Sequence, residues 1–307
     1  FFISMISNEK EQKLIAIYFY ICDLYDKELC FLCQRNSNNF QPEFTDQELM
    51  TIYLFAGHEQ RYFQINEIHS FTKDYLLNWF PKLPSYQTFS YRLNLLVGAF
   101  QALANKLIGS FKPENCSSLL SLVDSMPIIT CAGKNRTGKV ATELTAKGFC
   151  STKNLYYYGC KIHTLASVRQ GKIPFPESII ITPAEDNDLT VFKQAWGDNI
   201  LSKVIFGDKI YSDKEYFNSN KRKTQHIEML TPVKGIKGQT EEIKQRDKAF
   251  NDIFSEAVSK VRQPIEAFFN WLNEKTKIQR AMKVRSTAGL LNHIYGKLAV
   301  AFIYLIF

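Results

Sequence analysis

The stretch LLSLVD at residues 119–124 decides the fold, because it is an apolar run that ends in an acidic residue, Asp124. The stretch VIFGD at residues 204–208 repeats this pattern and ends in Asp208. Short apolar runs of this kind predict buried strands, so both aspartates are expected at strand ends. Taken alone, each aspartate is more simply explained as a turn residue.

A third acidic residue, Glu266, lies in the stretch RQPIEAFFNW at residues 262–271, which predicts the opening turns of a helix. Taken alone, it is a first-turn acid that complements the helix dipole. Three carboxylates from three elements are, however, what a site for Mg²⁺ or Mn²⁺ needs, because these ions prefer oxygen ligands. Two such ions stabilise both the attacking and the leaving oxygen of a phosphodiester, so the three acids together predict phosphoryl transfer.

The rest of the second half mixes strands and helices. Strands are predicted at residues 156–168 and 173–182, and helices near 188–197, at 263–280 and at 286–303. Strands joined by a crossover helix predict an α/β or α+β layer fold.

The first 110 residues have the apolar spacing of helices instead. Helices are predicted at residues 9–33, 64–78 and 88–110, and a capping box at Thr45–Glu48 predicts the start of another. We therefore expect an all-helical N-terminal domain at residues 1–110 and a mixed domain at residues 111–307. Residues 131–155 are expected to form an exposed loop, and the highly charged residues 234–250 are expected to be mobile.

The net charge of +8 is unevenly distributed. Residues 200–307 contain 19 Lys and Arg against 11 Asp and Glu, whereas residues 1–199 contain 19 of each. A basic half beside a carboxylate site predicts a polyanionic partner, although lysine-rich loops that only solubilise the chain are an equal alternative. Seven Cys without a regular framework favour a reducing compartment. The ten apolar residues at 298–307 are too few to span a membrane and predict a helix end packed into the core.

Five segments in order give the chain a family resemblance. They are Val123–Ser125, Tyr158–His163, Thr182–Asp188, Gly207–Tyr211, and Arg262–Glu266 with the helix that follows. In the N-terminal part, the Thr45–Glu48 helix start and the Phe80–Tyr86 segment extend the likeness. On these motifs the chain resembles the DDE transposases of bacterial insertion sequences, most closely the insertion sequence 982 group.

The resemblance implies a ribonuclease H-like catalytic domain in which Asp124, Asp208 and Glu266 hold two divalent metal ions. It implies cutting of double-stranded DNA at the element ends and joining of the released 3′-hydroxyl to target DNA. It also implies a prokaryotic, cytoplasmic protein that works as a homodimer or higher multimer, since two ends must be held together.

Related groups often carry a Tyr, an Arg and a Lys around the last acid. Arg262 stands four residues before Glu266, as the resemblance implies. Ser259 occupies the Tyr position and Asn273 the Lys position, so this chain departs from the pattern at both. Three nearby basic residues are expected to contact DNA in their place: Lys275, Lys277 and Arg280.

Other basic residues are candidates for DNA phosphate contacts, which supply affinity and salt dependence. They are Lys134, Arg136 and Lys139 in the loop after the first strand, with Lys161, His163, Lys209 and Arg262. For His163, a half-buried strand histidine is an equal alternative. Asp186 and Asp188 precede a helix and are expected to cap it. For Asp188, an approach to the metals is the less favoured alternative.

Two rival functions remain open from the sequence. One is a DNA-binding protein that has lost catalysis, and the other is a metal-dependent nuclease that cuts without joining. Recognition of the element ends is assigned to the helices of residues 1–110, because a helix can enter the major groove. No basic recognition helix stands out there.

Overall fold

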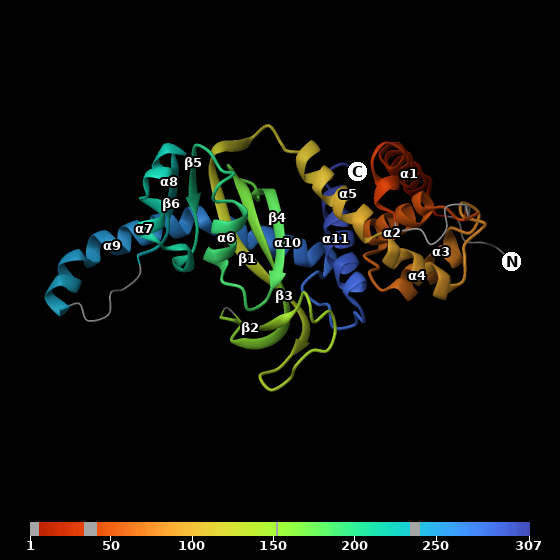
Figure 1. Cartoon of the computed structure of the whole chain (residues 1–307). Coiled ribbons are helices and arrows are strands. Elements are labelled where there is room, and N and C mark those ends of the chain that lie inside the picture. Colours follow the sequence, from red (N-terminus) through yellow and green to blue (C-terminus); the bar gives the residue numbers. More distant parts are fainter. Residues whose placement is uncertain (1–5, 34–41, 152, 234–239) are drawn as a thin grey trace. The chain divides into compact units, whose positions relative to one another are not determined.

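The computed structural model describes residues 6–33, 42–151, 153–233 and 240–307, and it divides into two compact units. Unit 1 contains residues 1–111 and 272–307, and unit 2 contains residues 112–271. The C-terminal residues 272–307, which the sequence analysis grouped with the mixed domain, thus belong to the helical unit. Figure 1 shows the elements of both units along the chain.

Unit 1 is built from helices, as predicted for residues 1–110. They are α1 (Asn8–Lys27), the 3-10 turn η1 (Leu29–Leu32), α2 (Asp46–Gln60), α3 (Ile65–Tyr75), α4 (Tyr86–Leu95), α5 (Val97–Ser110) and α11 (Thr287–Ile303). The capping box at the start of α2 is confirmed: the Glu48 amide donates to the Thr45 hydroxyl, and the Thr45 amide donates to the Glu48 carboxylate. The helix predicted at residues 88–110 is instead two helices, with Leu96 between them.

The C-terminal helix α11 supplies much of the core of unit 1. Its residues from Gly296 to Ile303 are all buried, and it packs against α5 and α2. This confirms that the apolar run near the C-terminus packs into a core.

Unit 2 contains a six-stranded mixed sheet. Its strands are β1 (Cys116–Ala132), β2 (Ala146–Cys150), β3 (Leu155–Arg169), β4 (Phe175–Pro183), β5 (Lys203–Phe206) and β6 (Ile227–Leu230). The order is β2-β3-β1-β5-β6, and β4 pairs with β3 beyond the part that β2 covers. The pairs β1–β3, β2–β3 and β3–β4 are antiparallel, whereas β1–β5 and β5–β6 are parallel.

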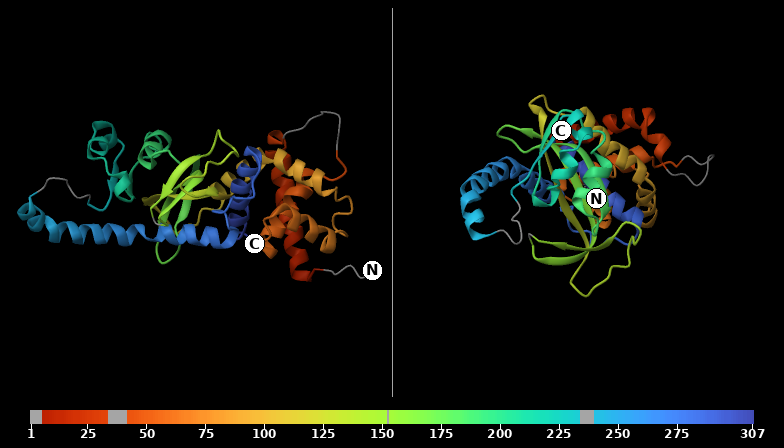
Figure 2. Two further views of the ribbon diagram at one scale, coloured as in Figure 1. Left: turned by 90° about the horizontal axis from the view of Figure 1, so that it is seen from below. Right: turned by 60° about the vertical axis from the view of Figure 1, so that its left-hand side comes forward.

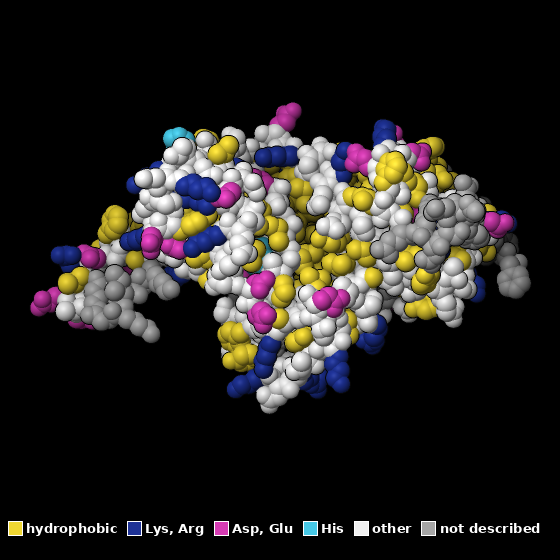
Figure 3. All heavy atoms as spheres, viewed as in Figure 1, with side chains coloured by type: hydrophobic (Ala, Val, Ile, Leu, Met, Phe, Trp, Pro, Cys, Tyr) yellow, Lys and Arg dark blue, Asp and Glu magenta, His cyan; other side chains and the backbone are white. Residues whose placement is uncertain are grey.

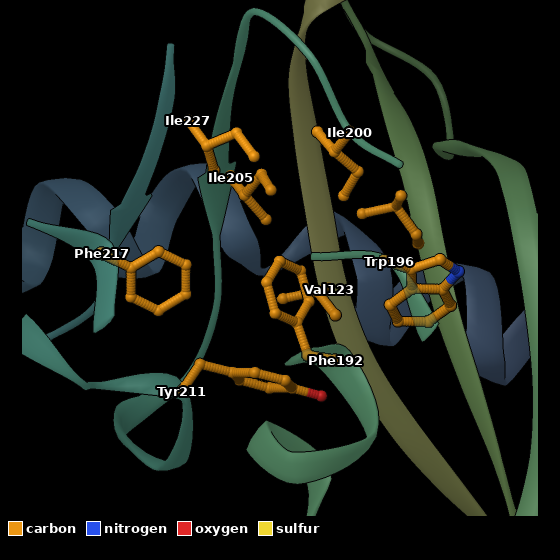
Figure 4. Close-up of a cluster of buried hydrophobic side chains, with 9 residues drawn as sticks. Val123, Phe192, Trp196, Ile200, Ile205, Tyr211, Phe217 and Ile227 are labelled. Carbon is orange, nitrogen blue, oxygen red and sulfur yellow. The ribbon is translucent and has the colours of Figure 1, made fainter. Parts of the chain in front are cut away.

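Helices connect and cover these strands. They are α6 (Asp188–Ala195), the 3-10 turn η2 (Lys209–Tyr211), α7 (Lys214–Phe217), α8 (Asn220–Thr224), α9 (Glu241–Arg262) and α10 (Pro264–Thr276). Figure 4 shows side chains of β1, α6 and β5 packed into one core with Tyr211 and Phe217. This cluster comprises Val123, Leu165, Phe192, Trp196, Ile200, Ile205, Tyr211, Phe217 and Ile227.

The structure corrects three predictions for unit 2. The loop expected at residues 131–155 contains β2, and strand β6 was not predicted. The segment at residues 234–250, which was expected to be mobile, is helical from Glu241 onwards, while residues 234–239 lie outside the described residues. Charged residues alone do not exclude a helix, because Glu, Lys and Arg are good helix formers.

Candidate active site

The sequence predicted that Asp124 ends its strand. This is wrong, because β1 continues to Ala132. What ends near Asp124 is the pairing with β5, whose last matched residues are Leu122 and Phe206. Beyond this point one side of β1 has no strand beside it among the described residues, so Pro127 is tolerated there. Asp124 therefore lies within an uninterrupted strand, and its explanation as a strand-end turn residue is wrong.

The same register brings Asp208 to the same edge of the sheet. Asp124 lies two residues past Leu122, and Asp208 lies two residues past Phe206 on the parallel neighbour. The side chain of Asp208 also accepts a hydrogen bond from the Ile210 amide at 2.8 Å and caps the 3-10 turn η2. Asp208 is thus a turn residue, as its simpler explanation predicted, and it also lies near Asp124.

Glu266 lies in the first turn of α10 and is linked to Asp124 through one arginine. Nη1 of Arg262 donates to Asp124 at 2.9 Å, and Nη2 donates to Glu266 at 2.8 Å. Arg262 is the last residue of α9, four positions before Glu266. The guanidinium fork therefore joins the sheet to the helix that carries the third acid.

The electrostatics of this edge favour a positive charge. Burial raises the pKa of Asp124 to about 7, Arg262 and the Ser125 amide oppose the rise, and Asp208 and Asp188 add to it. Burial also raises the pKa of Asp208, and Asp188 contributes. Carboxylates that disfavour one another's charge are stabilised when a cation joins them.

A fourth acid, Asp188, is bonded to Ser125, the residue that follows Asp124. It accepts from the Ser125 hydroxyl at 2.9 Å and from the Lys161 ammonium at 2.8 Å. The expected capping of α6 is performed by Asn187 instead, whose side chain accepts from the amides of Leu189 and Thr190. Asp188 is thus a member of the site.

His163 is buried on β3, with 1% of its surface exposed. Its Nε2 lies 2.9 Å from the Thr182 hydroxyl, and its Nδ1 lies 3.7 Å from Asp188. Burial lowers the pKa of His163 to about 4, so the ring is neutral near pH 7. Of the two roles considered from the sequence, this geometry matches that of a packed strand histidine.

Tyr211 is a residue of this region that sequence reasoning did not single out. Its side chain is fully buried, and its hydroxyl has no hydrogen-bond partner among the described residues. Figure 4 shows the ring at the edge of the core cluster with its hydroxyl pointing away from Phe217 and Ile227. Burial raises the pKa of Tyr211 well above its usual value, and the charges of Asp188, Asp124 and Asp208 raise it further.

The donor chemistry fits a hard divalent cation, and the geometry fits it in part. One guanidinium bonds Asp124 and Glu266 together, so these carboxylates converge on a single positive group. The buried Tyr211 hydroxyl is a further unpaired oxygen beside the acids. Within the described ranges, however, no three His, Cys, Asp or Glu side chains are close enough to hold a metal ion in this conformation.

The family described as "Transposase DDE domain" matches residues 117–303, which is more than half of the chain and includes all three acids. The chain belongs to this family. No curated protein matches it. Membership supports a function in transposition, and the mixed sheet with its helices fits the ribonuclease H-like fold. Members of the DDE transposase family generally depend on divalent metals and act on DNA.

The structure places the transposase's predicted DNA contacts in three settings. Lys134, Arg136, Lys139 and Lys209 are exposed. Figure 3 shows basic side chains gathered over β2 and the loop before it. Lys161, His163 and Arg262 instead lie inside the acidic site, where Lys161 is paired with Asp188. Lys275 belongs to unit 1, with its ammonium 4.8 Å from the ring centre of Tyr304.

None of the described helices of the transposase is both long enough and apolar enough to cross a membrane.

Proposed function

We propose that this chain cuts DNA at the ends of a mobile element and joins the released 3′-hydroxyl to target DNA. In this proposal Asp124, Asp208 and Glu266 hold two Mg²⁺ or Mn²⁺ ions. The observation that carries it is the Arg262 fork, which draws a strand acid and a helix acid of the family-matched region onto one positive group.

The bound ions would lower the pKa of the attacking hydroxyl and stabilise the leaving oxygen. The chain's own residues prepare the site for them. The Ser125 amide donates to Asp124 at 2.8 Å and fixes one carboxylate oxygen. Asp188 holds the Ser125 hydroxyl and Lys161, so β1, β3 and α6 keep a constant spacing around Asp124.

Arg262 has two consecutive tasks in this proposal. Without metal, it neutralises the carboxylates of Asp124 and Glu266. With a cation held by the acids, the guanidinium would be free to bond a phosphate oxygen of the DNA, for which its planar fork is well suited.

The finer assignments complete the proposal. The chain is a member of the insertion sequence 982 group and binds double-stranded DNA as a homodimer or higher multimer. The exposed Lys134, Arg136 and Lys139 hold the DNA backbone, and the helices of residues 1–110 recognise the element ends. Deletion of residues 1–110 is expected to abolish end-specific binding, and specificity that persists would contradict this last assignment.

The test uses the purified full chain, Glu266→Gln, and Glu274→Gln as a matched control at an exposed position of the same helix. Each is incubated with Mg²⁺ or Mn²⁺ and DNA that carries both element ends with flanking sequence. The proposal expects end-specific nicks and joined products from wild type and the control, and neither from Glu266→Gln. Nicks without joined products would favour a nuclease, and DNA binding without any cutting would favour a protein that has lost catalysis.

A further inference from the structure

Strands β2 and β3 carry a pair of aromatic side chains on their outer face. Phe149 on β2 lies directly opposite Tyr156 on β3, and their ring centres are 4.8 Å apart. Phe149 is 48% exposed and Tyr156 is 39% exposed. In the right-hand view of Figure 2, β2 and the loop before it extend beyond the other strands of the sheet. The solvent face of an antiparallel pair is ordinarily polar, so two adjoining exposed rings require an explanation.

The opposite face of the same strands supplies their core contacts. Side chains alternate between the two faces of a strand, so Tyr157 lies on the other face from Tyr156. Tyr157 is 2% exposed and packs with Ile129 and Ala184 in a small buried cluster. The fold therefore does not depend on burial of the aromatic pair, which is available to a partner.

The loop before β2 limits the size of this surface. Tyr158 lies on the same face as Tyr156, two residues further along β3. A Cβ atom at Gly138 would clash with the ring of Tyr158, so the loop passes directly over this ring and needs a glycine there. The open surface is thus limited to the rings of Phe149 and Tyr156.

Positive charges flank the aromatic pair. The ammonium groups of Lys134 and Lys147 lie 5.8 Å and 5.9 Å from the ring centre of Tyr156, and both lysines are exposed. Residues 133–151 carry four basic side chains against one acidic side chain, namely Lys134, Arg136, Lys139 and Lys147 against Glu143. Figure 3 shows apolar and basic side chains side by side over β2. The surface therefore suits a polyanion that also presents flat apolar groups.

Unpaired nucleotides of a DNA strand have this combination of chemistry. In a duplex the bases stack on one another, so their faces are closed to a protein surface. An unpaired base can instead stack on an aromatic side chain while basic side chains contact the phosphates on either side. Aromatic residues on neighbouring strands of a sheet are a known arrangement for stacking the bases of a single strand.

We propose that Phe149 and Tyr156 form a stacking platform for unpaired bases of DNA, with Lys134 and Lys147 contacting the phosphates of the same strand. The inference deepens the proposed function, on which it rests for the identity of the nucleic acid, because it adds unpaired nucleotides beside a duplex to the substrate. A strand end released by a nick is no longer held in the duplex from both sides, so such nucleotides arise in the proposed reaction.

The experiment measures binding of the full chain, without metal, to a DNA duplex that ends in a short single-stranded tail. A second duplex carries abasic sugars in the tail, so that the phosphates remain and the bases are removed. Wild type is expected to bind the tail with bases at least about 5-fold more tightly, which is the lower end of what one stacked base contributes.

Variants separate stacking from phosphate contact. Phe149→Leu with Tyr156→Leu keeps apolar bulk but removes the ring faces, and it is expected to bind the two duplexes equally. Phe250→Leu, at an exposed aromatic residue of α9, is the matched control and is expected to keep the preference. Lys134→Gln with Lys147→Gln is expected to weaken binding to both duplexes alike, because both retain their phosphates. Thermal unfolding checks that each variant is folded.

Two results would overturn the proposal. One is equal affinity of wild type for the two duplexes, which needs no variant, and the other is a preference that survives in the double leucine variant. Because no metal is present and no strand is cut, either result would leave the proposed catalytic function standing. Loss of cleavage by an acid variant would likewise leave the platform untouched.

Discussion

Two of the places where this molecule buries charge do so in different ways. In unit 2, Asp124, Asp188, Arg262 and Lys161 form opposite-charge pairs that link a sheet to two helices. In unit 1, Lys297 is buried without an acidic partner in the part of the chain that the structure describes.

Lys297 is stabilised by neutral groups alone. Its ammonium donates to the Lys277 carbonyl at 3.2 Å and lies 5.0 Å from the ring centre of Phe63. Burial lowers the pKa of Lys297 to about 7, and no acidic group among the described residues opposes this shift, whereas the charge of Arg262 opposes the rise that burial causes in the pKa of Asp124. The difference teaches that burial alone does not mark a reactive site. Converging charged groups from separate elements do.

The largest effect is expected at Asp124. Asp124→Asn removes the anionic charge from the centre of the proposed metal site while keeping its shape. Strand cleavage is expected to fall by at least about 100-fold, because ligand contacts dominate metal-dependent catalysis. DNA binding should persist. Asp252→Asn, at an exposed position of α9, is the control. Full cleavage by Asp124→Asn would remove this residue from the site.

Arg262→Gln tests how far the guanidinium charge stabilises the two acids that it bonds. Loss of the fork leaves Asp124 and Glu266 without their shared cation, and the free energy of unfolding is expected to fall by about 1–3 kcal/mol. Thermal unfolding with and without Mg²⁺ measures it. Mg²⁺ is expected to stabilise Arg262→Gln more than wild type, since the ion replaces the guanidinium. Equal responses of the two proteins would argue against a common position for arginine and metal.

Lys297→Met tests whether burial keeps Lys297 neutral in unit 1, through the dependence of the free energy of unfolding on pH. The pKa of Lys297 is about 7 in the fold and 10.5 when unperturbed, so between these values the unfolded chain binds the extra proton. Wild-type stability should therefore gain up to about 1.4 kcal/mol per pH unit from this residue across that window. The Met variant lacks this contribution, so its advantage over wild type is expected to shrink as pH rises from 7. Parallel stability curves for the two proteins would show that Lys297 stays charged in the fold.

The smallest effect is expected at Tyr211. Tyr211→Phe removes a buried hydroxyl that has no partner among the described residues, so the metal-free protein should be more stable by about 1 kcal/mol. Mn²⁺ binding, measured by calorimetry, is expected to weaken modestly if that hydroxyl bonds a water molecule of the ion. A destabilised variant would indicate that the hydroxyl is paired in solution.

The sequence predicts the three acids as a site because each lies in a strong local pattern. Apolar runs before Asp124 and Asp208, and a proline-started helix at Glu266, are visible without any tertiary information. The position of Asp124 within β1 was not predictable, because the run of apolar residues is interrupted by Asp124 and Ser125 whereas the strand is sustained by pairing with β3. Long-range register overrides local propensity in such strands.

The partners of the acids were less accessible from sequence. Asp188 was expected to cap α6, and its contacts with Ser125 and Lys161 show that it belongs to the site. Tyr211 was not singled out, because Asp208 was the residue of the Gly207–Tyr211 motif that the chemistry of a metal site indicated. Helix α9 was not predicted, because its high density of charged residues was interpreted as a mobile segment.

The central claim is that Asp124, Asp208 and Glu266 form one cation site. The most direct measurement is anomalous diffraction from crystals of the full chain grown with Mn²⁺. The account predicts anomalous density coordinated by all three carboxylates, with Arg262 displaced from the bridge that it makes between Asp124 and Glu266. Crystals saturated with Mn²⁺ that show no density there, with Arg262 still bonded to both acids, would contradict it.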